Sequence, residues 1–288
     1  MSGVQLWWAL LGAASALNLL AWAWSARALR RRRAELGPHL YRARRLQLGL
    51  SAVYVGGCAW RSAFPVHDVP RVCLLDSWMS TVIVGRTVAT LAELAFVAQW
   101  ALLLREIARA AGSAVGGRAA AALLGVIVVA EGFSWHAVLT RSNFGHVVEE
   151  SLWGACAAAL VVYLLALWPR SDARLRLLIA ACSVAGLTYV AFMFAVDVPM
   201  YWARWTAEVA RKEPALTILD GALDAAQPCT VSHDWEHWRT EIPWMSLYFT
   251  VAVWISLAFI HVPRLQRRGR VGRGGRPVHG LRPRPWRG

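Results

Sequence analysis

A segment near the C-terminus, SHDWEHWRTEIPWM, carries histidines and carboxylates at a spacing suited to metal binding. His233 and His237 are four residues apart, so a helix would place both imidazoles on one face. With Glu236 the segment also reads H-x-x-E-H, a pattern found in zinc proteases. Two imidazoles on one face can share a zinc ion, and a nearby carboxylate can accept protons from zinc-bound water. The segment therefore predicts a metal site, with a solvated aromatic rim at the start of a membrane helix as the alternative interpretation.

Ionisable residues inside apolar stretches form a second candidate site. Arg86 and Glu93 are seven residues apart, which is two helical turns, so they share a face with Thr90 between them. Glu131 falls at a similar depth in the next apolar stretch, and Asp197 ends a later one. Charged groups at membrane depth are costly and are therefore functional candidates. This buried polar network predicts either an ion-pair structure that fixes helix packing or a site that relays protons or binds an ion.

The elements that position these residues are membrane spans, because the chain is too apolar for an ordinary soluble domain. Hydrophobic residues make up 57% of the sequence and the mean hydropathy is +0.41. Apolar runs of about 20 residues, the length needed to cross a bilayer, occur seven times. They are Val4–Ala26, Leu46–Phe64, Ser77–Leu104, Ala119–Leu139, Glu149–Trp168, Leu175–Val198 and Ile242–Val262. We therefore expect an all-α polytopic membrane protein whose seven transmembrane helices form one antiparallel bundle over residues 1–263, in a plasma or bacterial inner membrane.

The net charge of +14 follows from this topology rather than from nucleic-acid binding. Connecting segments on one side of the bundle carry 23 Arg and three acidic residues, and those on the other side, together with the span ends that border them, carry six basic and twelve acidic residues. The positive-inside rule then places the N-terminus outside and the C-terminus in the cytoplasm. The lipid bilayer is the expected partner. Residues 264–288, rich in Arg, Gly and Pro, predict a disordered basic tail attracted to anionic lipid of the inner leaflet.

The predicted outer loops contain a candidate disulfide and one long excursion. Cys73 and Cys229 both fall in outer loops, where an oxidising environment allows pairing, and Cys58 is a competing partner. The excursion over residues 199–241 begins with tryptophans at helical spacing. We expect an amphipathic helix at the outer surface there, ended by Pro214.

Topology and a few residues together resemble one known family. Seven spans, an outer N-terminus and a His-x-x-x-His at the start of the last span are similar to the alkaline ceramidase and progestin–adipoQ receptor superfamily of membrane hydrolases. The matching positions are Ser62, His67, Asp76, His233 and His237. The resemblance implies a zinc ion held by the three histidines, with the serine and the aspartate nearby. It also implies that zinc-activated water attacks a lipid amide or ester.

We interpret the chain as a metal-dependent membrane hydrolase with an outer-facing site for a lipid-like substrate. The candidate catalytic residues are Ser62, Asp76 and Glu236. One alternative is an ion- or proton-coupled transporter or channel using Arg86, Glu93 and Glu131, and another is a seven-span receptor or sensor. The hydrolase requires the three histidines within about 5 Å of one another. The transporter requires its charged residues to line a connected polar cavity, and the receptor an outer pocket without convergent ligands.

Overall fold

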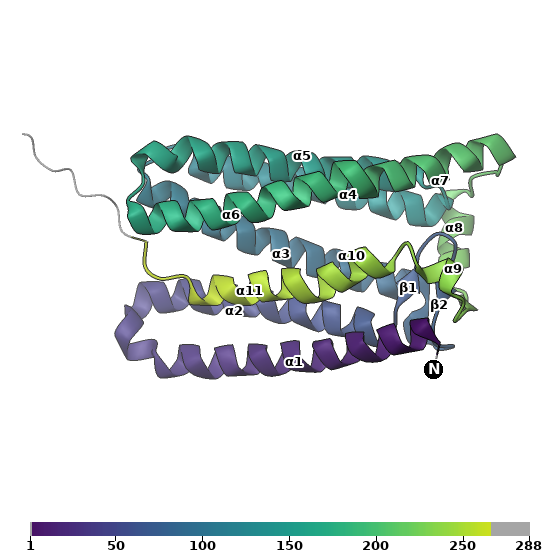
Figure 1. The fold of residues 1–288 in the computed structure, drawn as a ribbon, viewed down its shortest axis with the longest axis horizontal. Coiled ribbons are helices and arrows are strands. Elements are labelled where there is room, and N and C mark those ends of the chain that lie inside the picture. The colour runs from purple at the N-terminus through teal and green to yellow at the C-terminus, as the bar shows by residue number, and fades with distance from the viewer. Residues whose placement is uncertain (1, 266–288) are drawn as a thin grey trace, which may run out of the picture.

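The computed structural model describes residues 2–265, and these are helical apart from short strands and loops (Figure 1). The long helices are α1 (Gly3–Arg31), α2 (Arg33–Ala63), α3 (Val82–Ala110), α4 (Gly116–Thr140), α5 (Phe144–Leu167) and α6 (Ala173–Phe192). The shorter helices are α7 (Val198–Arg211), α8 (Ile218–Ala225), α9 (Trp235–Trp238), α10 (Ile242–Leu247) and α11 (Val253–His261). The strands are β1 (Val66–His67), β2 (Val72–Cys73) and β3 (Thr230–Val231). The predicted basic tail lies outside the described residues except for Arg264 and Leu265.

Six helical segments of the described chain are long and apolar enough to cross a membrane. They are Gly3–Arg31, Val82–Ala110, Gly116–Thr140, Phe144–Arg170, Ala173–Arg211 and Ile242–His261. These helices confirm the all-α prediction and indicate a multi-pass integral membrane protein. The predicted span Leu46–Phe64 falls on α2, which ends at Ala63; this helix has a comparable length of 31 residues but is more polar and is not one of the six.

Helix ends coincide with capping residues and backbone breaks. The Ser2 side chain accepts a hydrogen bond from the Gln5 backbone, and the Gln5 side chain accepts one from the Ser2 backbone, which together cap α1. Asp172 caps the start of α6 with its carboxylate. Gly37 has a left-handed φ of 69° directly before Pro38, so α2 is kinked near its start. The chain turns back between Arg32 and this kink, so that α2 lies beside α1.

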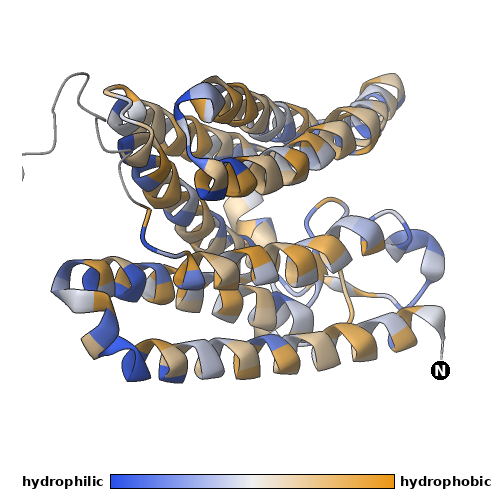
Figure 2. Cartoon of the chain, turned by 60° about the vertical axis from the view of Figure 1, so that its left-hand side comes forward, coloured by the Kyte–Doolittle hydropathy of each residue, from blue (hydrophilic) through white to orange (hydrophobic). Residues whose placement is uncertain are grey.

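The long helices form two layers on either side of α3 (Figure 1). One layer contains α1, α2 and α11, the other contains α4, α5 and α6, and α3 packs against both α2 and α4. The ribbon of the long helices is mostly orange to tan in Figure 2, so the bundle is largely apolar along its length. Leu10, Leu20 and Leu177 are all more than half exposed, which suits contact with lipid rather than water.

The helix predicted after the sixth apolar run is present, but it continues directly from the preceding long helix instead of forming a separate helix at the surface. A π-helical turn, η3 (Met193–Asp197), joins α6 directly to α7, so that a helix of 39 residues extends past the bundle (Figure 1). Pro199 sits in the first turn of α7 and has no backbone N–H to donate, and the wider π-helical turn before it accommodates that loss. The helix ends at Lys212, which has a left-handed φ of 55°.

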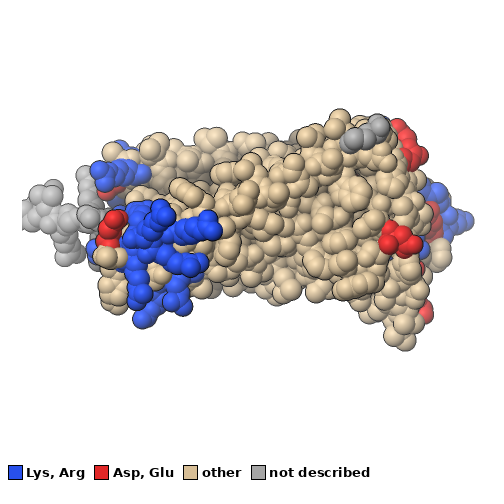
Figure 3. Space-filling model, turned by 90° about the horizontal axis from the view of Figure 1, so that it is seen from below, with Lys and Arg blue, Asp and Glu red and all other residues tan. Residues whose placement is uncertain are grey.

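The two ends of the bundle differ in charge. Figure 3 shows Lys and Arg gathered at one end. This basic end holds the turns from α1 to α2, from α3 to α4 and from α5 to α6, and the end of α11. At the opposite end, which we call the cap end, β1, β2 and β3 form a small sheet in that order. A disulfide between Cys73 and Cys229 joins β2 to the residue preceding β3, which confirms the predicted pairing.

Loss of this disulfide should loosen the cap end without disturbing the spans. The bond links residues 156 positions apart. We expect Cys73→Ser to lower the free energy of unfolding by about 2–5 kcal/mol, because the crosslink restricts the unfolded chain. Thermal unfolding in detergent measures the change, with Cys182→Ser, a buried free cysteine, as control. Cys229→Ser and the double variant should match Cys73→Ser, and a melting temperature equal to that of the native chain would contradict the prediction.

Candidate functional site

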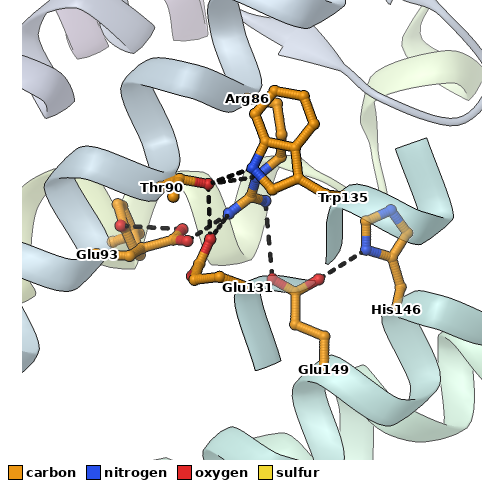
Figure 4. A network of polar contacts seen from close by, with 8 residues as sticks. Arg86, Thr90, Glu93, Glu131, Trp135, His146 and Glu149 are labelled. Carbon is orange, nitrogen blue, oxygen red and sulfur yellow. Dashed lines mark hydrogen bonds and ion pairs between the residues drawn. The ribbon is translucent and has the colours of Figure 1, made fainter. Parts of the chain in front are cut away.

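Three of the four residues predicted to form a buried polar network, Arg86, Glu93 and Glu131, meet at the arginine (Figure 4), whereas Asp197 makes no ion pair with them among the described residues. The Arg86 guanidinium, on α3, pairs with Glu93, which lies two turns further along the same helix. It also pairs with Glu131 of α4, whose Oε2 lies 2.9 Å from Arg86 Nη2. Glu149 of α5 lies 3.7 Å from the other terminal nitrogen. Thr90 accepts a hydrogen bond from Arg86 and donates one to Glu131. One cation is therefore shared by three buried carboxylates.

Neighbouring polar groups hold these carboxylates in place. The Tyr248 hydroxyl donates to Glu93 over 3.1 Å, and Trp135 donates its indole N–H to the threonine of the network. His146 Nδ1 lies 2.8 Å from the Glu149 carboxylate (Figure 4). The donors come from α4, α5 and η4 (Tyr248–Ala252), a π-helical turn between α10 and α11. Four segments that are distant in sequence therefore converge on the arginine.

A cavity of about 440 Å³ lies beside this network, a volume typical of small-molecule sites. Both π-helical turns, η3 and η4, contribute to its lining, and such turns are frequent at functional sites. Its charged lining residues are Arg61, Asp68, Arg86, Glu93, Glu149, Glu150, Asp197 and Glu241. Further toward the basic end the lining is apolar, with Trp100, Leu123, Ile127, Leu160, Val251 and Ile255. The cavity is therefore polar and acidic near the cap end and apolar in its deeper part.

Three of the lining carboxylates lack partners among the described residues. Neither Glu150 of α5 nor Asp197 of η3 makes a hydrogen bond or ion pair within residues 2–265, and Asp68 Oδ1 is buried without a donor. Asp197 is only 6% exposed and Asp68 only 9%. Burying an ionised carboxylate without a partner is unfavourable by several kcal/mol. These groups consequently need protons or a bound cation to offset their charge.

A second buried cluster lines the cavity at the cap end. Glu241 accepts hydrogen bonds from Arg204 of α7 at 2.8 Å and from Trp244 at 2.7 Å, and His67 Nε2 of β1 lies 3.2 Å away. Burial opposes ionisation of the Glu241 carboxyl, but His67 and Arg204 outweigh it and lower its pKa to about 2. Burial also lowers the pKa of His67 below its ordinary value of 6.5. The positive charge opposite Glu241 at neutral pH is therefore that of Arg204.

Comparisons with known proteins add no assignment to this geometry. The chain matches no family model, no curated protein and no solved structure. Its function is therefore inferred from the cavity and from the charges around it.

The structure does not bring the predicted zinc ligands together. His67 lines the cavity, whereas His233 and His237 are exposed at the cap end, and His237 Nδ1 is hydrogen-bonded to Ser232. Asp234 caps α9, so His233 precedes the helix and does not share a helical face with His237. Within the described residues, the group of three possible ligands that lies within 4.8 Å is Glu93, Glu131 and Glu149. The Arg86 guanidinium already lies between those carboxylates.

The residues predicted to be catalytic are also dispersed. The Ser62 hydroxyl is buried and donates to the Cys58 carbonyl one helical turn earlier. Asp76 is exposed in the loop before α3, and Glu236 pairs with Arg239 on the surface of α9. These three side chains therefore do not form an acid–base site with His67.

One buried polar feature was not predicted from the sequence. Polar or polarisable side chains follow one face of α2 at intervals of three or four residues, and all are buried. They are Arg44, Gln47, Ser51, Tyr54, Cys58 and Arg61. Gln47 and Gln99 donate to each other's backbone carbonyls, and the Ser256 hydroxyl donates to the Gln99 side-chain oxygen and lies 3.0 Å from the Ser51 hydroxyl, from which it can accept. The helical spacing of these residues within the second apolar run was the available signal.

Proposed function

We propose that the chain is a proton- or ion-coupled membrane carrier that binds its cargo in the acidic cavity. The observation that carries the proposal is the excess of carboxylates around the cavity: six line it, against two lining arginines and Arg204, which pairs with one of the six. Protonation or cation binding offsets this excess, so the two events compete for the same groups. Competition between a proton and a cargo for one buried site is the thermodynamic basis of coupled transport.

The arrangement of the arginine network favours a carrier over a hydrolase. A carrier requires the buried charges to border a connected polar cavity, and Arg86 and Glu93 both line it while Glu131 contacts the arginine. Intramembrane ionisable residues that face such a cavity are characteristic of ion and proton pathways. A hydrolase requires a nucleophile or an activated water beside an acid–base pair, and the predicted candidates are dispersed.

The topology we propose for the carrier has seven spans, with α2 as the seventh. α2 runs beside α1 and contacts α3 and α11. Its buried polar face explains its low hydropathy, since that face is turned away from lipid. The distribution of Arg supports an orientation with the basic end in the cytoplasm and the N-terminus outside. In this orientation the acidic part of the cavity lies near the outer surface.

A step in pH applied to the reconstituted protein tests the proposal without knowledge of the cargo. When the medium is switched from neutral to mildly acidic pH, protons entering the cavity should produce a transient charge displacement in solid-supported membrane electrophysiology. We expect the displacement to fall severalfold in Glu150→Gln and further in the double variant with Asp197→Asn, because both remove a protonatable group.

The matched control is Glu35→Gln, which removes an exposed carboxylate at the basic end. It should behave like the native protein. A native response no larger than that of protein-free membranes, or equal responses in all variants, would refute the carrier proposal.

A further inference from the structure

We infer that the cargo is an organic ammonium ion: a primary or secondary amine, charged at neutral pH, attached to an apolar body. This inference rests on the proposed carrier function and names its substrate class. It follows from three features of the cavity: one end is acidic and the other apolar, the acidic end has carboxylates without partners, and aromatic rings surround that end.

The polar end of the cavity holds more unpartnered carboxylates than unpartnered cations: among residues 2–265, Arg61 is the lining arginine that makes no hydrogen bond or ion pair, against three such carboxylates. Asp68, Glu150 and Asp197 have carboxylate oxygens without partners among residues 2–265, and two of these side chains are more than nine-tenths buried. The Arg86 guanidinium is already shared by three glutamates. An anionic cargo would meet this uncompensated negative charge, whereas an ammonium group can donate up to three hydrogen bonds to it.

Aromatic rings surround the same end of the cavity and favour a cation further. The rings of Trp153, Tyr189, Tyr201 and Trp244 contribute to the lining. The faces of such rings attract ammonium groups, most strongly where water is excluded. Arg61 already shows this preference, since its guanidinium lies 5.6 Å from the centre of the Trp244 ring.

The size of the apolar part of the cavity favours an organic cation over a bare metal ion. An ion bound at the carboxylates would leave the apolar part of the 440 Å³ cavity unfilled. That part is lined by α3, α4, α5 and α11 through large side chains, among them Trp100, Leu160 and Ile255. An apolar body placed there would remove its own surface from water, which is favourable by about 25 cal/mol per Å². The ammonium group would then reach the carboxylates near the cap end.

Three probes that share one ring system test this inference in the detergent-purified protein. They are 1-naphthylmethylamine, the neutral 1-naphthylmethanol and the anionic 1-naphthaleneacetate, each titrated by isothermal calorimetry at neutral pH. We expect the amine to bind at least roughly tenfold more tightly than the alcohol, the effect of one good charged hydrogen bond, and the anion to bind most weakly. Asp197→Asn and Glu150→Gln should each lower the affinity for the amine to nearly that for the alcohol, whereas Glu35→Gln should leave the affinity for the amine unchanged.

Several outcomes would overturn the inference. Equal binding of amine and alcohol, preference for the anion, or no binding of any probe would each exclude an organic ammonium cargo of this kind. If the pH step still produced a charge displacement that depended on Glu150, the carrier proposal would stand and only the substrate class would fail. If that displacement were absent as well, both would fail.

Discussion

Replacement of Arg86 by methionine is expected to destabilise the protein more than any other single change considered. The substitution keeps an unbranched, somewhat shorter side chain but leaves Glu93, Glu131 and Glu149 without the charge that they share. Removing one partner from a buried ionic group is unfavourable by about 3–5 kcal/mol. For a chain of this size that corresponds to a fall of roughly 10 °C in melting temperature. Thermal unfolding followed by size-exclusion chromatography in detergent measures the change.

Compensating variants separate lost charge balance from lost packing. Arg86→Lys keeps the charge but not the several N–H donors of the guanidinium, so an intermediate melting temperature is expected. Adding Glu131→Gln to Arg86→Met removes one of the uncompensated carboxylates and should restore part of the loss. If the double variant were as unstable as the sum of the two single variants, the ion pairs would not be coupled, and our account of the network would be wrong.

Acidification is expected to weaken the cap end through Glu241. Because its pKa in the folded protein is lowered from 4.5 to about 2, the ionised carboxylate stabilises the fold. This contribution is fully present above pH 4.5 and disappears as the pH falls toward 2. The shift corresponds to a free energy on the order of 3 kcal/mol, since one pKa unit is equivalent to about 1.4 kcal/mol. Melting temperatures measured across this pH range give the curve.

Glu241→Gln is the informative variant for this pH dependence. It should be less stable than the native protein at neutral pH, because Arg204 loses its charged acceptor, and its melting temperature should decline less steeply below pH 4.5. His67 contributes in a higher range: its lowered pKa favours the neutral form, so its contribution is lost as the pH falls below 6.5. Parallel curves for the two proteins between pH 4.5 and 2 would show that Glu241 is not responsible.

The sequence predicted the positions of the spans better than their ends. The apolar runs mark where lipid surrounds the chain, and six of the seven match helices that are long and apolar enough to cross a membrane. The helices continue past the runs into Arg-bearing turns, because backbone hydrogen bonding does not stop where hydropathy does. The remaining run lies on α2. This helix is long enough, at 31 residues, but its buried polar face lowers its hydropathy.

Local spacing was informative only where a regular helix was present. Arg86 and Glu93 lie on an uninterrupted helix, so their separation of seven residues predicted a shared face, and the structure places them in contact. The same reasoning applied to His233 and His237 was wrong, because the helix there is four residues long and begins after Asp234. Periodicity does not reveal such a short element.

Hydropathy and charge were sufficient to indicate a helical membrane protein, because both are local properties that each segment carries whatever its neighbours are. The acidic cavity is not a local property. Asp68 comes from the loop after β1, Glu150 from α5 and Asp197 from a π-helical turn, and they border one cavity only because each segment is rotated to face the others. That rotation depends on packing around α3 and on the disulfide that fixes the cap end. No single segment specifies it.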